Sequence, residues 1–132
     1  MSVSVPPEEG DVYTYERTFT PEDVRQFGEI SGDQQSIHTD PDDEGRLVVQ
    51  GLLTATLPTK IGGDLGYIAS EMKYEFFKPV YTGNTITCDV TTESVEERDD
   101  RYEVMLSIVC YNEEGDDVMQ GHTDGLFWKE GE

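Results

Sequence analysis

The chain has 132 residues, the length of a single domain (1–132), and 35% of them are hydrophobic, enough for one compact core. Acidic residues outnumber basic ones 29 to 9, for a formal net charge of −20. This charge argues against nucleic acid and anionic membranes as partners, because both are negative. No stretch approaches the roughly 20 apolar residues of a membrane span, and no signal peptide is evident, so a cytoplasmic location is expected.

The acidity itself suggests a folded protein from a high-salt cytoplasm, that is, a halophile. At about 1 M salt the Debye length is about 3 Å, so crowded carboxylates barely repel one another. An ordinary acidic mesophilic protein is the alternative. The charge is uneven, because residues 46–88 carry only 3 acidic and 4 basic residues. We expect this middle third to be buried, paired with another subunit, or in contact with a ligand.

The first two predicted elements are a strand and a short helix. Residues 11–20 alternate in the manner of a strand. Residues 20–31 predict a helix with Thr20 as its cap, Pro21 at its first position, and an apolar stripe of Val24, Phe27 and Ile30. Residues 32–45 are rich in Gly, Asp, Ser and Pro, which predicts a loop.

A second helix is predicted over residues 46–63, which leave almost no polar face. A helix that is apolar all round is a buried helix. Gly62 and Gly63 should end it, and Pro58 should kink or end it earlier.

Four strands are expected after this helix, at 72–80, 85–95, 101–111 and 117–128, with short turns between them. Consecutive strands with short turns predict an antiparallel meander. Cys88 and Cys110 fall at apolar strand positions, which favours buried reduced thiols over a disulfide. An apolar helix in so small a domain needs a sheet wrapped around it, so the fold class is α+β.

The stretch ISGDQQSIHTDP, residues 30–41, carries the candidate chemistry. Side chains five positions apart lie on different faces of a helix or a strand. Asp33 and His38 can therefore converge only if the backbone turns between them. A carboxylate beside an imidazole can hold a water and move protons, which contributes roughly 10²–10⁴ in rate. The alternative is that Asp33 caps a turn and His38 is a partly exposed loop residue.

This stretch, together with the later VVQGLLTATL, resembles the hydratase motif of the MaoC-like dehydratases, the (R)-specific enoyl-CoA hydratase family. The matching residues are Ser31, Gly32, Asp33, Ile37, His38, Asp40, Pro41 and Gly51. The later FKPVYTGNT, residues 77–85, resembles the family's entry to its third strand. The resemblance runs from about residue 12 to 128. It implies the hot-dog fold, an antiparallel sheet wrapped around a central buried helix, and a homodimer or higher homo-oligomer.

The resemblance also implies roles for individual residues. Asp33 and His38 would hold the catalytic water, the Gly51 amide would bind the thioester oxygen, and Thr59 would support the dyad. The alternative for Gly51 is tight packing of helix on sheet. Three residues depart from the family pattern, since Gln35 stands for an asparagine, Ser36 for a proline, and Gln50 for a histidine. These departures put the position of the dyad and the substrate range in question.

The implied reaction is hydration of a trans-2-enoyl-CoA to an (R)-3-hydroxyacyl-CoA, or the reverse dehydration. An acyl-carrier protein is an equally open carrier, and the acyl chain is open. No metal and no cofactor is expected beyond the thioester itself. Arg46, Lys60, Lys73 and Lys78 are candidates to meet the CoA phosphates. Two alternatives remain, a hot-dog acyl-CoA thioesterase and a non-catalytic acyl-thioester-binding subunit.

Overall fold

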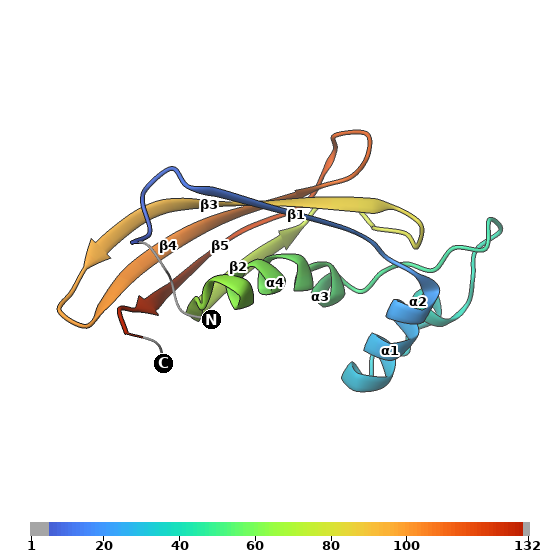
Figure 1. Cartoon of the computed structure of the whole chain (residues 1–132). Helices are drawn as coiled ribbons and strands as arrows, with labels where there is room; N and C mark the ends of the chain where they lie inside the picture. The colour runs from blue at the N-terminus through green and yellow to red at the C-terminus, as the bar shows by residue number, and fades with distance from the viewer. Residues whose placement is uncertain (1–5, 131–132) are drawn as a thin grey trace.

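The computed structural model describes residues 6–130. Its elements in chain order are β1 (Val12–Thr18), α1 (Pro21–Ser31), α2 (Ser36–Thr39), α3 (Gly51–Thr54), α4 (Thr56–Leu65), β2 (Ile68–Phe76), β3 (Thr85–Glu97), β4 (Arg101–Tyr111) and β5 (Asp117–Trp128). The five strands form one curved sheet, with α4 along its concave face and α1 and α2 beyond one end (Figure 1).

The central helix differs from its predicted bounds at both ends. It begins at Gly51 and not at residue 46, because Leu47 and Val49 are buried in an extended segment whose Val49 N–H donates to the Val80 carbonyl. It also continues through both glycines to Leu65, and Gly66 ends it at a φ of 80°.

Pro58 was predicted to kink or end the helix, and the helix is indeed broken, about one turn before Pro58. The helix is interrupted at Ala55, between α3 and α4. Proline has no N–H for the carbonyl four residues back, and its ring crowds that carbonyl, which here belongs to Thr54.

The strand order is β1-β3-β4-β5-β2, and every pair is antiparallel. The predicted meander is confirmed for β3, β4 and β5 but is wrong for β2, which lies beside β5 and not beside β3. The glycines of β5 explain this partner. A Cβ at Gly121 would lie 2.1 Å from the Lys73 carbonyl oxygen, and one at Gly125 would lie 2.3 Å from the Ile68 carbonyl oxygen. Only glycine lets the two backbones approach so closely.

The core lies between α3–α4 and the concave face of the sheet. Leu53, Leu57 and Ile61 from the helices pack there with alternate residues of β3 and β4, which are Ile86, Cys88, Val90, Val104, Leu106, Ile108 and Cys110. Cys88 and Cys110 are free, buried and opposite each other in the sheet, which confirms the prediction of buried reduced thiols.

The central helix is covered on one side only, so the prediction that it is buried all round is wrong for this single chain. Leu52 is 63% exposed on α3. The predicted stripe of α1 is likewise incomplete, since Val24 is buried while Ile30 is 86% exposed. Within residues 6–130, these apolar side chains are left uncovered.

Candidate active site

Asp33 is placed by the end of α1. The helix begins with the predicted cap, in which Thr20 and Asp23 exchange side-chain hydrogen bonds with each other's backbone N–H. It ends at Gly32, whose φ of 79° turns the chain sharply and whose N–H donates to the Gly28 carbonyl. Asp33 follows directly after this turn.

Two neighbours hold Asp33 in place. Its backbone N–H donates to the Ser31 hydroxyl at 3.1 Å. The Gln35 side-chain amide donates to the Asp33 Oδ1 at 2.9 Å. This amide hydrogen bond is the main cause that lowers the pKa of Asp33 below its ordinary value, with smaller help from the Gln35 backbone N–H and from His38. Asp33 is therefore an ionised acceptor over the physiological range.

His38 lies on the short helix α2, which the sequence predicted as loop. The side chain is 7% exposed. Its Nδ1 lies 2.6 Å from the Val48 carbonyl oxygen. A carbonyl only accepts, so Nδ1 carries the hydrogen, and in the neutral form of the ring Nε2 then presents a bare lone pair.

The structure brings the two predicted residues together. The Asp33 Oδ2 lies 3.4 Å from the His38 Nε2. With the imidazole neutral, both atoms are acceptors and cannot bond to each other. A water molecule that donates one hydrogen to each would join them. The geometry therefore suits a pair that holds a water and takes a proton from it.

Replacing Gln35 with leucine should raise the pKa of the Asp33 carboxyl, because the amide that stabilises the ionised form is lost. A carbon-detected NMR titration of the Asp33 carboxyl measures this pKa directly. Gln34→Leu is the matched control, since the Asp33 carboxylate has no hydrogen bond to Gln34 in the described part of the chain. Equal Asp33 pKa values in the two variants would contradict the assigned role of Gln35.

Gly51 lies at the exposed start of α3, and within residues 6–130 its N–H finds no hydrogen-bond acceptor. Gly51 and His38 line the same cavity of about 430 Å³, together with Thr54 and Phe76. A Cβ at position 51 would lie 3.0 Å from the Phe76 ring, so packing also favours glycine here. A smaller adjoining cavity of about 200 Å³ contains both Asp33 and His38. His38 thus connects the dyad to the free amide of Gly51.

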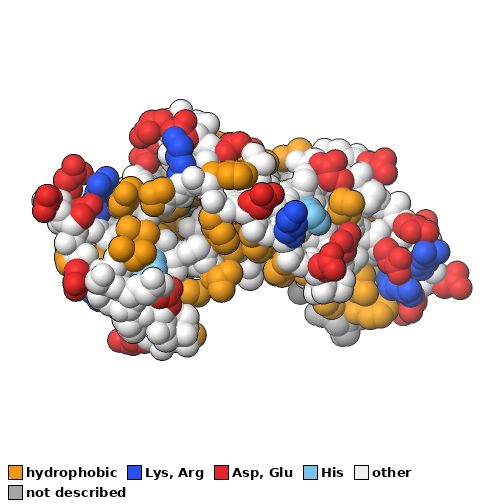
Figure 2. Space-filling view, turned by 180° about the vertical axis from the view of Figure 1, so that it is seen from behind, with side chains coloured by type: hydrophobic (Ala, Val, Ile, Leu, Met, Phe, Trp, Pro, Cys, Tyr) orange, Lys and Arg blue, Asp and Glu red, His pale blue; other side chains and the backbone are white. Residues whose placement is uncertain are grey.

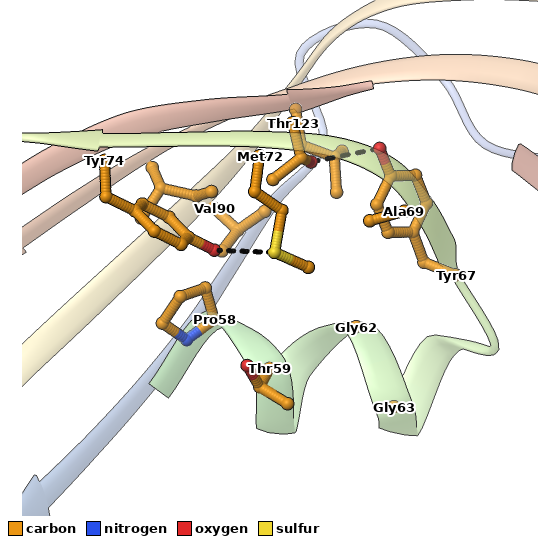
Figure 3. Close-up of a pocket in the computed structure, with 12 residues that line it drawn as sticks. Pro58, Thr59, Gly62, Gly63, Tyr67, Ala69, Met72, Tyr74, Val90 and Thr123 are labelled. Carbon is orange, nitrogen blue, oxygen red and sulfur yellow. Dashed lines mark hydrogen bonds between the residues drawn. The ribbon is translucent and has the colours of Figure 1, made fainter. Parts of the chain in front are cut away.

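The fourth predicted residue, Thr59, lies apart from the other three in this chain. Its hydroxyl donates to the Ala55 carbonyl of its own helix at 3.0 Å. It lines a separate cavity of about 200 Å³ between α4 and β2, with Gly62 on the helix and Met72 and Tyr74 on the strand (Figure 3). This cavity is mostly apolar and lies further along the helix from Gly51.

Two of the three departures from the family pattern fit their surroundings, while the third, Gln50, has a buried Oε1 without a hydrogen-bond partner among the described residues. Gln35 reaches Asp33, as described above. Ser36 is the first residue of α2, the position where a proline would also fit. The buried Gln50 donates its amide N–H to the Val24 carbonyl at 3.0 Å, which ties α1 to the start of α3. Sequence reasoning missed the roles of Gln50 and of the Val48 carbonyl, because both act through contacts distant in sequence.

Three of the four basic residues predicted to bind the CoA phosphates form ion pairs with acidic residues of the chain. Arg46 pairs with Asp42 and stacks on the Tyr81 ring. Lys60 pairs with Asp64, and Lys78 pairs with Asp116. Only the fourth, Lys73, has no ion pair with any residue that the structure describes. The excess of acids explains this, since most bases find an acid nearby.

A model of the family described as "MaoC like domain" matches residues 4–110. The mitochondrial 3-hydroxyacyl-[acyl-carrier-protein] dehydratase of Arabidopsis thaliana is 30% identical over 109 residues, in a match that covers 77% of this chain and 66% of that relative. The chain thus spans just under two thirds of that relative's length. Its named activity belongs to the hydro-lyase class that the sequence predicts.

Solved structures share the fold. A protein from Archaeoglobus fulgidus has a TM-score of 0.81 and 27% identity, covering 96% of this chain and 83% of its own. The (R)-hydratase from A. caviae involved in PHA biosynthesis has a TM-score of 0.81 and 23% identity, covering 90% of this chain and 96% of its own. These matches confirm the predicted α+β hot-dog fold.

No helix within residues 6–130 is long and apolar enough to cross a membrane. The cytoplasmic location and the halophilic origin stay predictions.

Proposed function

Because the chain belongs to the MaoC-like family of dehydratases, we propose that it adds water to a trans-2-enoyl thioester to give an (R)-3-hydroxyacyl thioester, or catalyses the reverse dehydration. The observation that carries this proposal is the pairing of the Asp33 Oδ2 with the His38 Nε2 at 3.4 Å, with the other imidazole nitrogen tied to Val48. Two acceptors in this geometry are suited to one water.

In the proposed mechanism, the oxygen of that water forms a bond to C3 while one of the two acceptors takes its proton. The π electrons of the C2=C3 bond move toward the thioester, and C2 then receives a proton from the dyad, so that one water is added overall. The free Gly51 N–H would donate to the thioester oxygen as negative charge develops there, and one such donor contributes about 10²–10³ in rate. No metal or redox cofactor takes part in this scheme.

We assign the acyl chain to the space between the central helix and β2. The cavity with His38 and Gly51 includes Thr54 of α3, and the apolar cavity of Figure 3 begins at Pro58, about one helical turn further on. A thioester oxygen at Gly51 would therefore direct its acyl chain along α4 toward Gly62. The carrier is CoA or an acyl-carrier protein, and the named substrates of the plant relatives carry the latter.

We also propose that two copies of the chain form a homodimer through the free edge of β2. Leu52, Met72 and Phe76 are each more than half exposed along this side. Hydrophobic side chains gather in patches among the acidic ones in Figure 2. A second copy would cover the open side of the central helix and pair an unprotected sheet edge.

The function is tested with crotonyl-CoA and crotonyl-acyl-carrier protein, by the absorbance of the conjugated thioester at high salt. A hydratase removes this absorbance without releasing free thiol, which is the expected result. Thiol release would instead identify the thioesterase alternative. Binding without any turnover of crotonyl or of longer and branched enoyl thioesters would identify the non-catalytic alternative.

A further inference from the structure

Three side chains that can bind metal meet on β2 and β5. The pairing of these strands places Glu71 opposite Asp124 and Lys73 opposite His122. One ligand atom from each of Glu71, His122 and Asp124 lies within 4.8 Å of the other two. The pairing register shifts between Ala69 and Glu71, and such a bulge re-aims the side chains beside it.

This cluster lies on the outer face of the sheet, away from the Asp33–His38 pair. Side chains alternate between faces along a strand. Thr123 is buried on the inner side, where its hydroxyl lies 3.0 Å from the Tyr67 hydroxyl. Its neighbours His122 and Asp124 therefore point outward. His122 is half-buried, and Glu71 is exposed.

The part of the chain that the structure describes offers these three side chains no polar partner. Within residues 6–130, the side chains of Glu71, His122 and Asp124 take part in no hydrogen bond or ion pair. The Lys73 ammonium is close in the register, yet in the described structure it pairs with neither carboxylate. Two carboxylates held near each other without a counter-charge repel, and a bound cation would remove this repulsion.

We propose that Glu71, His122 and Asp124 form a zinc-binding site that ties the edge strand β2 to β5. One imidazole nitrogen and two carboxylate oxygens are ligands that Zn²⁺ accepts, with a fourth position left for water. Mg²⁺ and Ca²⁺ prefer all-oxygen sites. The proposal departs from the expectation that no metal is bound. Sequence spacing could not reveal the site, because strand pairing alone brings Glu71 to His122. It is independent of the proposed reaction.

The test uses the full chain freed of metal, with Zn²⁺ binding measured by calorimetry and the melting temperature measured with and without Zn²⁺. We expect one Zn²⁺ per chain and a higher melting temperature. His122→Gln and Glu71→Gln should each weaken binding by more than about 100-fold, since loss of a group that merely supports a ligand costs about 10- to 100-fold.

Two controls separate this site from general attraction to an acidic surface and from the dyad. Glu75→Gln removes the same charge from the same strand, and Asp33→Asn removes the dyad carboxylate. Both should bind Zn²⁺ as the wild type does. The proposal is overturned if the wild type takes up no stoichiometric Zn²⁺, or if Glu75→Gln or Asp33→Asn weakens binding as much as Glu71→Gln. Unchanged binding in both His122→Gln and Glu71→Gln would also overturn it.

Discussion

Asp33→Asn is expected to lower kcat for crotonyl thioester hydration by roughly 10²–10⁴, with little change in KM. Asparagine has the shape of aspartate, and its Oδ1 can still accept the hydrogen bond that Gln35 donates at 2.9 Å. It cannot, however, take a proton from the water that we propose Asp33 and His38 to share. The measurement is the loss of thioester absorbance, and circular dichroism checks that the variant is folded.

Asp40→Asn is the matched control, because it removes an equal charge from an aspartate at the end of α2. It should retain wild-type kcat. The double variant Asp33→Asn/His38→Gln should lower kcat about as much as the worse single variant, because both side chains are proposed to act on one water. Wild-type activity in Asp33→Asn, or an effect of similar size in Asp40→Asn, would remove Asp33 from the mechanism.

Raising KCl from about 0.1 M to about 2 M is expected to raise the melting temperature and to favour the dimer. The chain carries a net charge of −20, and the Debye length falls from about 10 Å at 0.1 M to about 3 Å at 1 M. Screening therefore relieves repulsion both within a chain and between two chains. A gain of a few kcal/mol corresponds to roughly 10 °C for a domain of about this size.

Melting is followed by circular dichroism, and assembly by light scattering against the chain mass of 14.9 kDa. Sucrose is the control solute, because it strengthens burial by exclusion from the surface but does not screen charge. A melting temperature that is flat in KCl, or that rises equally in sucrose, would favour the ordinary acidic protein. A monomer at every salt concentration would contradict the proposed dimer.

Local signals in the sequence were sufficient wherever one element decides its own structure. Thr20 and Pro21 predict the start of α1, and the alternation of Ile86, Cys88 and Val90 predicts the buried face of β3. The predicted start of the central helix was wrong. A short apolar run such as Leu47–Val49 has no periodicity that distinguishes a buried extended segment from a helix. The predicted position of β2 in the sheet was also wrong, because this position depends on a distant pair of glycines in β5.

The candidate site shows the same division. The convergence of Asp33 and His38 was predicted through the resemblance to a family, because a spacing of five residues is itself weakly specific. The tautomer of His38 could not be predicted, since it follows from the Val48 carbonyl ten residues away. The proposed zinc ligands depend entirely on which strands pair, so their sequence positions gave no signal.

At position 28, the stability of α1 and the placement of Asp33 favour different residues. A Cβ at Gly28 would lie 3.3 Å from the Asp33 carbonyl oxygen, a contact tight enough to require movement of the loop. Alanine at a helix interior is favoured over glycine by roughly 0.5–1 kcal/mol. Stability alone would therefore favour a side chain here, while the proposed role of the Asp33–His38 pair would favour glycine. A substitution at Gly28 that stabilises the helix would therefore be expected to lower the proposed activity.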